Sequence, residues 1–158
     1  MNVAFYVSAV VAIAATGLVI VQRNAVHALL YLIVSLLAVG LVFFTLGAPF
    51  AAALEVITYA GAIMVLFLFV IMLLNLESVE GRRSFSVKWL GPIILTILLF
   101  VDLVYLLVSG NQGMTGTATS PTQVGQALFG PYLLGVELAS MLLLAGLVGA
   151  YHLGRRSP

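Results

Sequence analysis

Residues 51–76 read AAALEVITYAGAIMVLFLFVIMLLNL, an apolar run whose only charged side chain is Glu55. A transmembrane helix needs about 20 such residues to cross a hydrocarbon core of about 30 Å. Four further stretches meet this requirement, and 63% of the chain is hydrophobic whereas 7% is charged; soluble domains carry about 25% charged residues. The sequence therefore predicts an all-α integral membrane protein, a single membrane domain over 1–158, with five transmembrane helices at about 3–21, 25–46, 51–76, 89–108 and 131–153.

The distribution of basic residues predicts the orientation of these helices. All six lie in the first loop, the third loop or the C-terminal tail, at Arg23, Arg82, Arg83, Lys88, Arg155 and Arg156. These three segments fall on one side of a five-span protein, and the other side carries no Lys or Arg. Because basic loops stay in the cytoplasm, we expect the N-terminus outside and the C-terminus cytoplasmic.

The connections between the spans carry further signals. Asn24 is expected to cap the second span, and the uncharged, Gly- and Thr-rich segment 109–130 is expected to be a flexible outer loop. Within that loop, residues 124–129 are expected to form a short interfacial helix, and Pro131 is expected to start the last span, since proline is tolerated in a first helical turn.

The absence of cysteine from the sequence excludes several classes of protein. Without a thiolate the chain cannot hold a Cys-ligated iron–sulfur cluster or zinc ion. The segments outside the five spans are also too short for a soluble catalytic or nucleotide-binding domain. His27 and His152 both lie near cytoplasmic span ends, where two axial haem ligands are geometrically possible, but interfacial histidines more commonly bond to head groups or backbone. We expect neither cofactor nor metal on this chain.

Three carboxylates lie inside the predicted spans, namely Glu55, Asp102 and Glu137. Each costs about 2.5–3.5 kcal/mol near the centre of a transmembrane helix, and the spans hold no Lys or Arg to pair with them. Two interpretations stay open: the acids are protonated or hydrogen-bonded at helix interfaces and only structural, or they face cations supplied by partners or a hydrated path. Both predict that the chain does not meet lipid on all sides.

The third span has a polar face at α-helical spacing. Glu55, Thr58, Tyr59 and Ala62 recur at i, i+3, i+4 and i+7, which predicts a buried polar seam on one face. Gly61 lies at mid-membrane, where it favours either close helix packing or a local π-bulge. The functional interpretation is a helix that switches between two windings and moves Tyr59 in and out of a proton or water path.

Three stretches of this sequence carry a resemblance to a known family. EVITYAGAIMVLF at 55–67 resembles the signature of the subunit J family of bacterial proton-translocating NADH:quinone oxidoreductase, respiratory complex I, the counterpart of mitochondrial subunit 6. NAVHALLYL at 24–32 is similar to the start of the family's second span, and VELASMLLLAG at 136–146 is similar to its last span. The resemblance covers nearly the whole chain.

The resemblance implies a non-redox membrane subunit of a proton-translocating enzyme complex in the bacterial inner membrane. It implies an obligate hetero-oligomer within the lipid bilayer, beside subunits H, A, K and N, without a nucleic-acid partner. NADH, FMN, iron–sulfur clusters and a quinone would be bound by the whole complex rather than by this chain.

The resemblance also implies roles for particular residues of the third span. This helix would switch between a π-bulge and a regular helix over the residues matching Tyr59 to Val65. Tyr59 would line a water chain toward an intramembrane glutamate of subunit K, and Gly61 would permit the rewinding. Glu55 would be an ancillary acid, and the other two intramembrane carboxylates are further candidates for that role.

Other functions remain as alternatives. Related segments occur in multisubunit cation/proton antiporters and membrane-bound hydrogenases. A purely structural subunit that stabilises its neighbours would carry the same spans. A homo-oligomeric channel is disfavoured, because no span has the repeated polar lining expected of a pore.

Overall fold

The computed structural model describes residues 3–74, 90–109 and 119–155, and the regular structure of these residues is helical. Five of its segments are long and apolar enough to cross a membrane, as the sequence predicts: Val3–Val21, Ala25–Thr45, Pro49–Leu73, Leu90–Val108 and Leu133–Gly154. The chain divides into two compact units, Met1–Ala118 and Thr119–Pro158, and each is described by itself.

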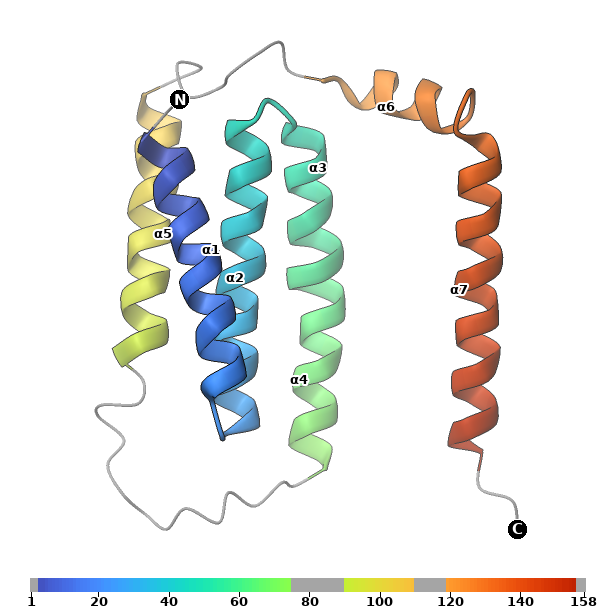
Figure 1. Cartoon of the computed structure of the whole chain (residues 1–158), viewed down its shortest axis with the longest axis horizontal. Helices are drawn as coiled ribbons and strands as arrows, with labels where there is room; N and C mark the ends of the chain where they lie inside the picture. Colours follow the sequence, from blue (N-terminus) through green and yellow to red (C-terminus); the bar gives the residue numbers. More distant parts are fainter. Residues whose placement is uncertain (1–2, 75–89, 110–118, 156–158) are drawn as a thin grey trace. The chain divides into compact units, whose positions relative to one another are not determined.

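The first unit contains four of these segments (Figure 1). Its elements are α1 (Val3–Val21), α2 (Ala25–Thr45), α3 (Pro49–Leu54), η1 (Glu55–Ile63), α4 (Met64–Leu73) and α5 (Leu90–Val108). The three elements α3, η1 and α4 follow one another without a break and together form the third span. The beginning of α1, the α2–α3 turn and the end of α5 lie at one end of this unit, here called the Gly47 end. The α1–α2 turn lies at the other, here called the Arg23 end.

Two short turns set the antiparallel course of the first three spans. At the start of α2, the Asn24 side chain accepts hydrogen bonds from the backbone N–H groups of Val26 and His27, at 3.0 and 3.4 Å; the predicted cap is confirmed. At the end of α2, Gly47 has a φ of 82°, and the Ala48 N–H donates to the Phe43 carbonyl at 3.0 Å. Glycine adopts this left-handed conformation without a steric penalty, which lets the chain reverse directly into α3.

The core of the first unit lies where α2 meets its neighbours. α2 contacts α1, α3, η1, α4 and α5. The buried cluster draws residues from three helices: Val11, Ala15, Val34, Ala38 and Leu99. Because lipid tails are as apolar as these side chains, close packing of small residues stabilises such an interface more than exclusion of water does.

A glycine fixes the approach of α5 to the beginning of α2. Tyr31 is 4% exposed, and a Cβ atom added at Gly91 would fall on the Tyr31 hydroxyl. Gly91 and Pro92 lie in the first turn of α5. The absence of a side chain at this glycine therefore makes room for the buried tyrosine.

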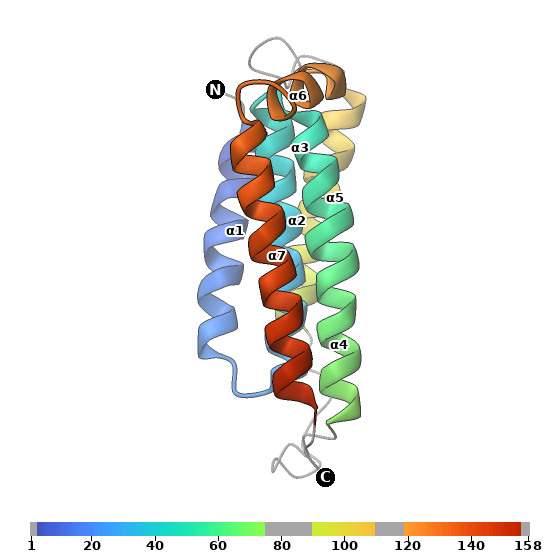
Figure 2. The same cartoon turned by 90° about the vertical axis from the view of Figure 1, so that its right-hand side faces the viewer.

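The second unit contains α6 (Pro121–Leu128) and α7 (Leu133–Gly154). Figure 2 shows α6 turned across the N-terminal end of α7. Ser120 and Gln123 form a capping box at the start of α6, with Ser120 Oγ accepting from the Gln123 N–H at 3.3 Å and Gln123 Oε1 accepting from the Ser120 N–H at 3.1 Å. This helix corrects two predictions, because 121–128 is not a loop and the short helix begins before residue 124.

The turn between α6 and α7 corrects the predicted start of the last span. The Tyr132 N–H donates to the Ala127 carbonyl at 3.1 Å, and the Leu133 N–H donates to the Gly130 carbonyl at 3.2 Å. Residues 129–132 are thereby held in a turn, so Pro131 precedes the helix, which begins at Leu133. Residues 110–118 of the predicted flexible loop lie outside the described residues.

Candidate functional site in the third span

The third span changes its winding in the middle. Residues Glu55–Ile63 form the π-helix η1, between the regular helices α3 and α4. At its end, the Met64 N–H donates to the Tyr59 carbonyl, five residues back. π-helical turns are rare, and they occur frequently at functional sites. Of the two windings that the sequence leaves open, this structure has the π-helical one, over 55–63 rather than over the range Tyr59 to Val65 that the resemblance implies.

The π-helix contains three of the four residues predicted to form the site. Glu55, Tyr59 and Gly61 lie on η1, whereas Val65 is the second residue of α4. Glu55 is half-buried, and its Cγ would lie 3.9 Å from a Cβ atom added at Gly40 of α2. The aliphatic part of this acidic side chain therefore lies close to α2.

The predicted polar seam is not buried by the described helices of the first unit. Thr58 and Ala62 are exposed, and Tyr59 and Val65 are 49% and 46% exposed. The prediction assumed α-helical spacing, whereas each hydrogen-bonded turn of η1 holds an additional residue. The face of the third span toward α2 instead carries Ala52, Val56 and the aliphatic part of Glu55. Thr58 and Tyr59 are thus left exposed within the first unit, whereas Glu55 is half-buried.

The glycine that permits close helix approach is on α2 rather than on η1. A Cβ atom at Gly40 would lie 3.3 Å from Val56 Cγ2 and 3.7 Å from the Ala52 carbonyl oxygen. Around Gly61, the only described atom outside its immediate helical backbone that a Cβ would meet within 4 Å is the Val56 carbonyl oxygen, at 3.2 Å. π-helical hydrogen bonding pairs residues five apart, which places the Val56 carbonyl beside Gly61. This glycine therefore accommodates the winding of its own helix.

Asp102 lies at a helix interface, as one of the two interpretations of the acids predicts. It is 7% exposed, and Ser8 Oγ, which is fully buried, donates a hydrogen bond to Asp102 Oδ2 at 2.6 Å. The bond joins α5 to α1. Ser8 was not predicted from the sequence, although its depth in the membrane matches that of Asp102. Ser8 is five residues from the start of α1 and Asp102 is six from the end of α5, both at the Gly47 end.

A second group of hydroxyls joins α1 to α2. Thr16 Oγ1 and Ser35 Oγ lie 2.7 Å apart. Thr16 Oγ1 donates to the Ala12 carbonyl at 2.8 Å, and Ser35 Oγ lies 3.2 Å from the same oxygen. Hydroxyl bonds of this kind hold transmembrane helices in register. These hydroxyl contacts were not predicted from the sequence either.

The third intramembrane acid and the two histidines lie on separate helices or in separate units. Glu137 is an exposed residue of α7, in the second unit, so it is described apart from the other two acids. Of the two histidines, His27 is near the start of α2 and His152 is in the last turn of α7, one in each unit. Within 3–74, 90–109 and 119–155, no three His, Asp or Glu side chains gather as a metal site.

The fold and this span together define the class: a multi-span helical membrane protein whose third span has a π-helical middle. The model of the family NADH-ubiquinone/plastoquinone oxidoreductase chain 6 matches residues 15–153. The chain belongs to this family.

Curated relatives match along almost the entire chain. NADH-quinone oxidoreductase subunit J of Escherichia coli (strain K12) is 57% identical over 160 residues, which are 98% of this chain and 87% of the relative. The subunit J of Pseudomonas aeruginosa is 56% identical over 99% of this chain and 98% of its own length. A more distant relative, from Buchnera aphidicola subsp. Schizaphis graminum, is 46% identical over 98% of both chains.

Proposed function

We propose that this chain is the subunit J of a proton-translocating NADH-quinone oxidoreductase, and that its third span couples quinone reduction to proton movement. The observation that carries the first part is the 57% identity over 98% of the chain to a protein of that name. The relatives reported above share this name, which supports this function over an antiporter or hydrogenase subunit.

The proposed coupling uses a change in the winding of η1. If the i→i+5 bonds of residues 55–63 are replaced by i→i+4 bonds, the helix on one side turns relative to the other. One residue of α-helix corresponds to about 100° of rotation and 1.5 Å of rise. A change of that size would carry the exposed Tyr59 phenol away from one set of partner groups and toward another. The rewinding thus supplies the two-state element that coupling requires.

The polar side chains of this span suggest where a proton path would pass. Tyr59 is the exposed proton-bearing side chain nearest the middle of the span, and Glu55 lies one turn closer to the Gly47 end. In the proposed state, Tyr59 lines a water chain that leads to an intramembrane glutamate of subunit K. Gly61 permits the rewinding, and the acids Glu55, Asp102 and Glu137 are ancillary.

The proposed setting is the bacterial inner membrane, with the N-terminus outside and the C-terminus cytoplasmic. Subunits H, A, K and N are the proposed neighbours, and one of them would cover the exposed face of η1. In this proposal NADH, FMN, the iron–sulfur clusters and the quinone bind to the complex outside this chain.

The test is Tyr59→Phe in the intact complex, with Tyr105→Phe as the matched control. Tyr105 is also an exposed tyrosine within a span, at 57% exposure, but it lies on α5 and not on η1. We expect Tyr59→Phe to lower NADH-driven proton pumping several-fold while assembly is retained, and we expect Tyr105→Phe to leave pumping unchanged.

The same experiment distinguishes a purely structural subunit. That alternative predicts that assembly on native gels and pumping fall in parallel. Unchanged pumping and turnover in an assembled Tyr59→Phe complex would overturn the coupling proposal.

A further inference from the structure

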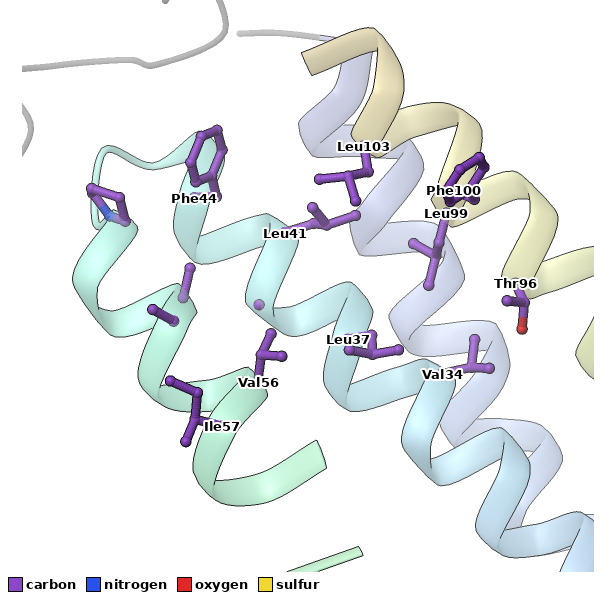
Figure 3. Close-up of a pocket in the computed structure, with 14 residues that line it drawn as sticks. Val34, Leu37, Leu41, Phe44, Val56, Ile57, Thr96, Leu99, Phe100 and Leu103 are labelled. Carbon is purple, nitrogen blue, oxygen red and sulfur yellow. The ribbon is translucent and has the colours of Figure 1, made fainter. Parts of the chain in front are cut away.

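The beginning of the third span packs closely against α2 at one point. A Cβ atom added to the buried Gly40 would lie 3.3 Å from Val56 Cγ2 and 3.7 Å from the Ala52 carbonyl oxygen. The next residue after each of these two is again small or β-branched, Ala53 and Ile57, and both are exposed. Figure 3 shows Val56 between the third span and α2, with Ile57 beside it, and both line the groove that the third span forms with α2 and α5. The side chains that face α2 are thus repeated one residue later on an exposed face.

A change from π to α winding shifts the beginning of the span by one residue when its end stays in place. The buried Met64 donates its N–H to the Tyr59 carbonyl in η1, whereas an i→i+4 bond would pair it with the carbonyl of Ala60. With Met64 held, Ala60 therefore moves to where Tyr59 was, and each earlier residue moves to the place of the residue before it. By the same shift, Ile57 takes the place of Val56 on α2.

This exchange replaces each side chain at α2 with a closely similar one. Ala53 replaces Ala52, so the small side chain at the close approach is unchanged. Ile57 replaces Val56, which adds one methylene group, and the adjoining groove of about 590 Å³ has room for it. Exchanges of apolar side chains that conserve volume are those that packing tolerates best. The first unit can therefore pack in either register.

The other half of the span does not repeat in this way. If the beginning stayed in place, the buried Met64 would give its place to Ile63, and the half-buried Leu68 would give its place to Phe67. The first exchange replaces an unbranched side chain with a β-branched one, and the second adds an aromatic ring. Such changes of shape and volume force neighbouring side chains to move. The beginning of the span is therefore the half that turns with the least repacking.

On the basis of the winding change proposed above, we propose that residues 52–57 form a packing face with two registers. Ala52 and Val56 contact α2 in the π-wound register, and Ala53 and Ile57 contact it in the rewound register. Ala53 and Ile57 are positioning residues, because they act by holding the turned span against α2. Two packings of similar free energy are what a two-state element requires.

The test uses disulfide formation in the assembled complex, because this chain has no cysteine of its own. One variant combines Gly40→Cys with Ile57→Cys, and its matched control combines Gly40→Cys with Glu55→Cys. Residue 55 lies beside position 40 in the π-wound register, where Glu55 Cγ is 3.9 Å from the added Cβ, and it moves away when the span rewinds. Each variant is oxidised at rest and during NADH-driven quinone reduction, and mass spectrometry measures the disulfide-linked fraction.

The two pairs should respond to turnover in opposite directions. We expect the linked fraction to rise several-fold for positions 40 and 57 and to fall for positions 40 and 55. Any other pattern would overturn the proposal, including the rise in both pairs that general mobility of the span would give.

A second measurement keeps the test decisive if the cysteine variants do not assemble. Ile57→Trp changes a residue that is 67% exposed in the π-wound register, but its ring is too large for the place of Val56 on α2. The control is Leu66→Trp, because Leu66 is 64% exposed on α4, beyond the segment that turns. Electron cryomicroscopy under turnover should show residues 55–63 held in the π-wound register by Ile57→Trp alone. Rewinding in Ile57→Trp would contradict the proposal, as would a rewound span in which Met64 has left its buried place.

These outcomes are distinguishable from those of the Tyr59→Phe experiment. Loss of pumping in Tyr59→Phe, without the opposite changes in the two disulfides, would overturn the two registers and leave the coupling role of Tyr59 standing. The opposite changes in the disulfides, with unchanged pumping in Tyr59→Phe, would support the two registers and overturn that role.

Discussion

Adding one methyl group at Gly61 should shift η1 toward regular α-helix. The Cβ atom would lie 3.2 Å from the Val56 carbonyl oxygen in the π-wound state, and that contact must relax by a few tenths of an ångström. Overpacking of this kind costs about 1 kcal/mol at its mild end, and the contact is specific to the five-residue turn. A bias of about 1 kcal/mol changes the ratio of the two windings about fivefold. Gly61→Val, with a branched Cβ, should roughly double that bias.

The assay compares Gly61→Ala, Gly61→Val and Gly17→Ala in purified complex. Gly17 lies inside α1, and a Cβ there meets no described atom within 4 Å, so it controls for the general gain in helix propensity. We expect Gly61→Ala to lower quinone-linked proton pumping and Gly61→Val to lower it further, with assembly retained in both. Gly17→Ala should leave pumping unchanged. Electron cryomicroscopy should show residues 55–63 increasingly in regular α-helix. A π-wound segment and full pumping in Gly61→Val would refute the reasoning.

Three further predictions concern the packing of the first unit. Ser8→Ala removes the donor to buried Asp102 and should lower the stability of the first unit by about 1.5–3 kcal/mol. Native gels should show dissociation at a lower temperature. An unchanged temperature would show that the 2.6 Å bond does not stabilise the protein. Gly91→Ala places a methyl group on the buried Tyr31 hydroxyl and should destabilise the first unit by about 1–3 kcal/mol. The double variant with Tyr31→Phe should regain the lost stability. Gly40→Ala should disturb the contact with Val56 Cγ2, 3.3 Å from the new Cβ, and Val56→Ala should restore the melting temperature in the double variant; strictly additive losses would contradict a shared contact.

The spans could be predicted from the sequence because length and hydropathy alone determine them. α1 begins and ends at the predicted residues, and Asn24 caps α2 as expected. α6 was placed too late because the Ser120–Gln123 capping box, with Pro121 at the first helical position, was not recognised as a helix start. That signal is present in the sequence.

Other features have no sequence pattern strong enough to predict them. The sequence allows a π-bulge at Gly61, but the periodicity that predicted a buried polar seam assumed an α-helical repeat, so it could not predict that Thr58 and Tyr59 are exposed on η1. Ser8 is a single serine in an apolar run, and its pairing with Asp102 depends on how α1 packs against α5. Such long-range pairs are set by tertiary packing and not by local sequence.

The two ends of η1 differ in how firmly they are held, and this determines which residues can move in a rewinding. Met64, just after η1, is 6% exposed, whereas Val56, near its beginning, is 41% exposed although it lies close to Gly40. Moving Met64 would expose or repack a buried side chain, while Val56 already has free surface. Between these two residues, the polar side chains of Thr58 and Tyr59 are exposed. A rewinding that keeps Met64 in place therefore moves the beginning of η1 and Tyr59 together, which is the motion that a coupling element in contact with a partner requires.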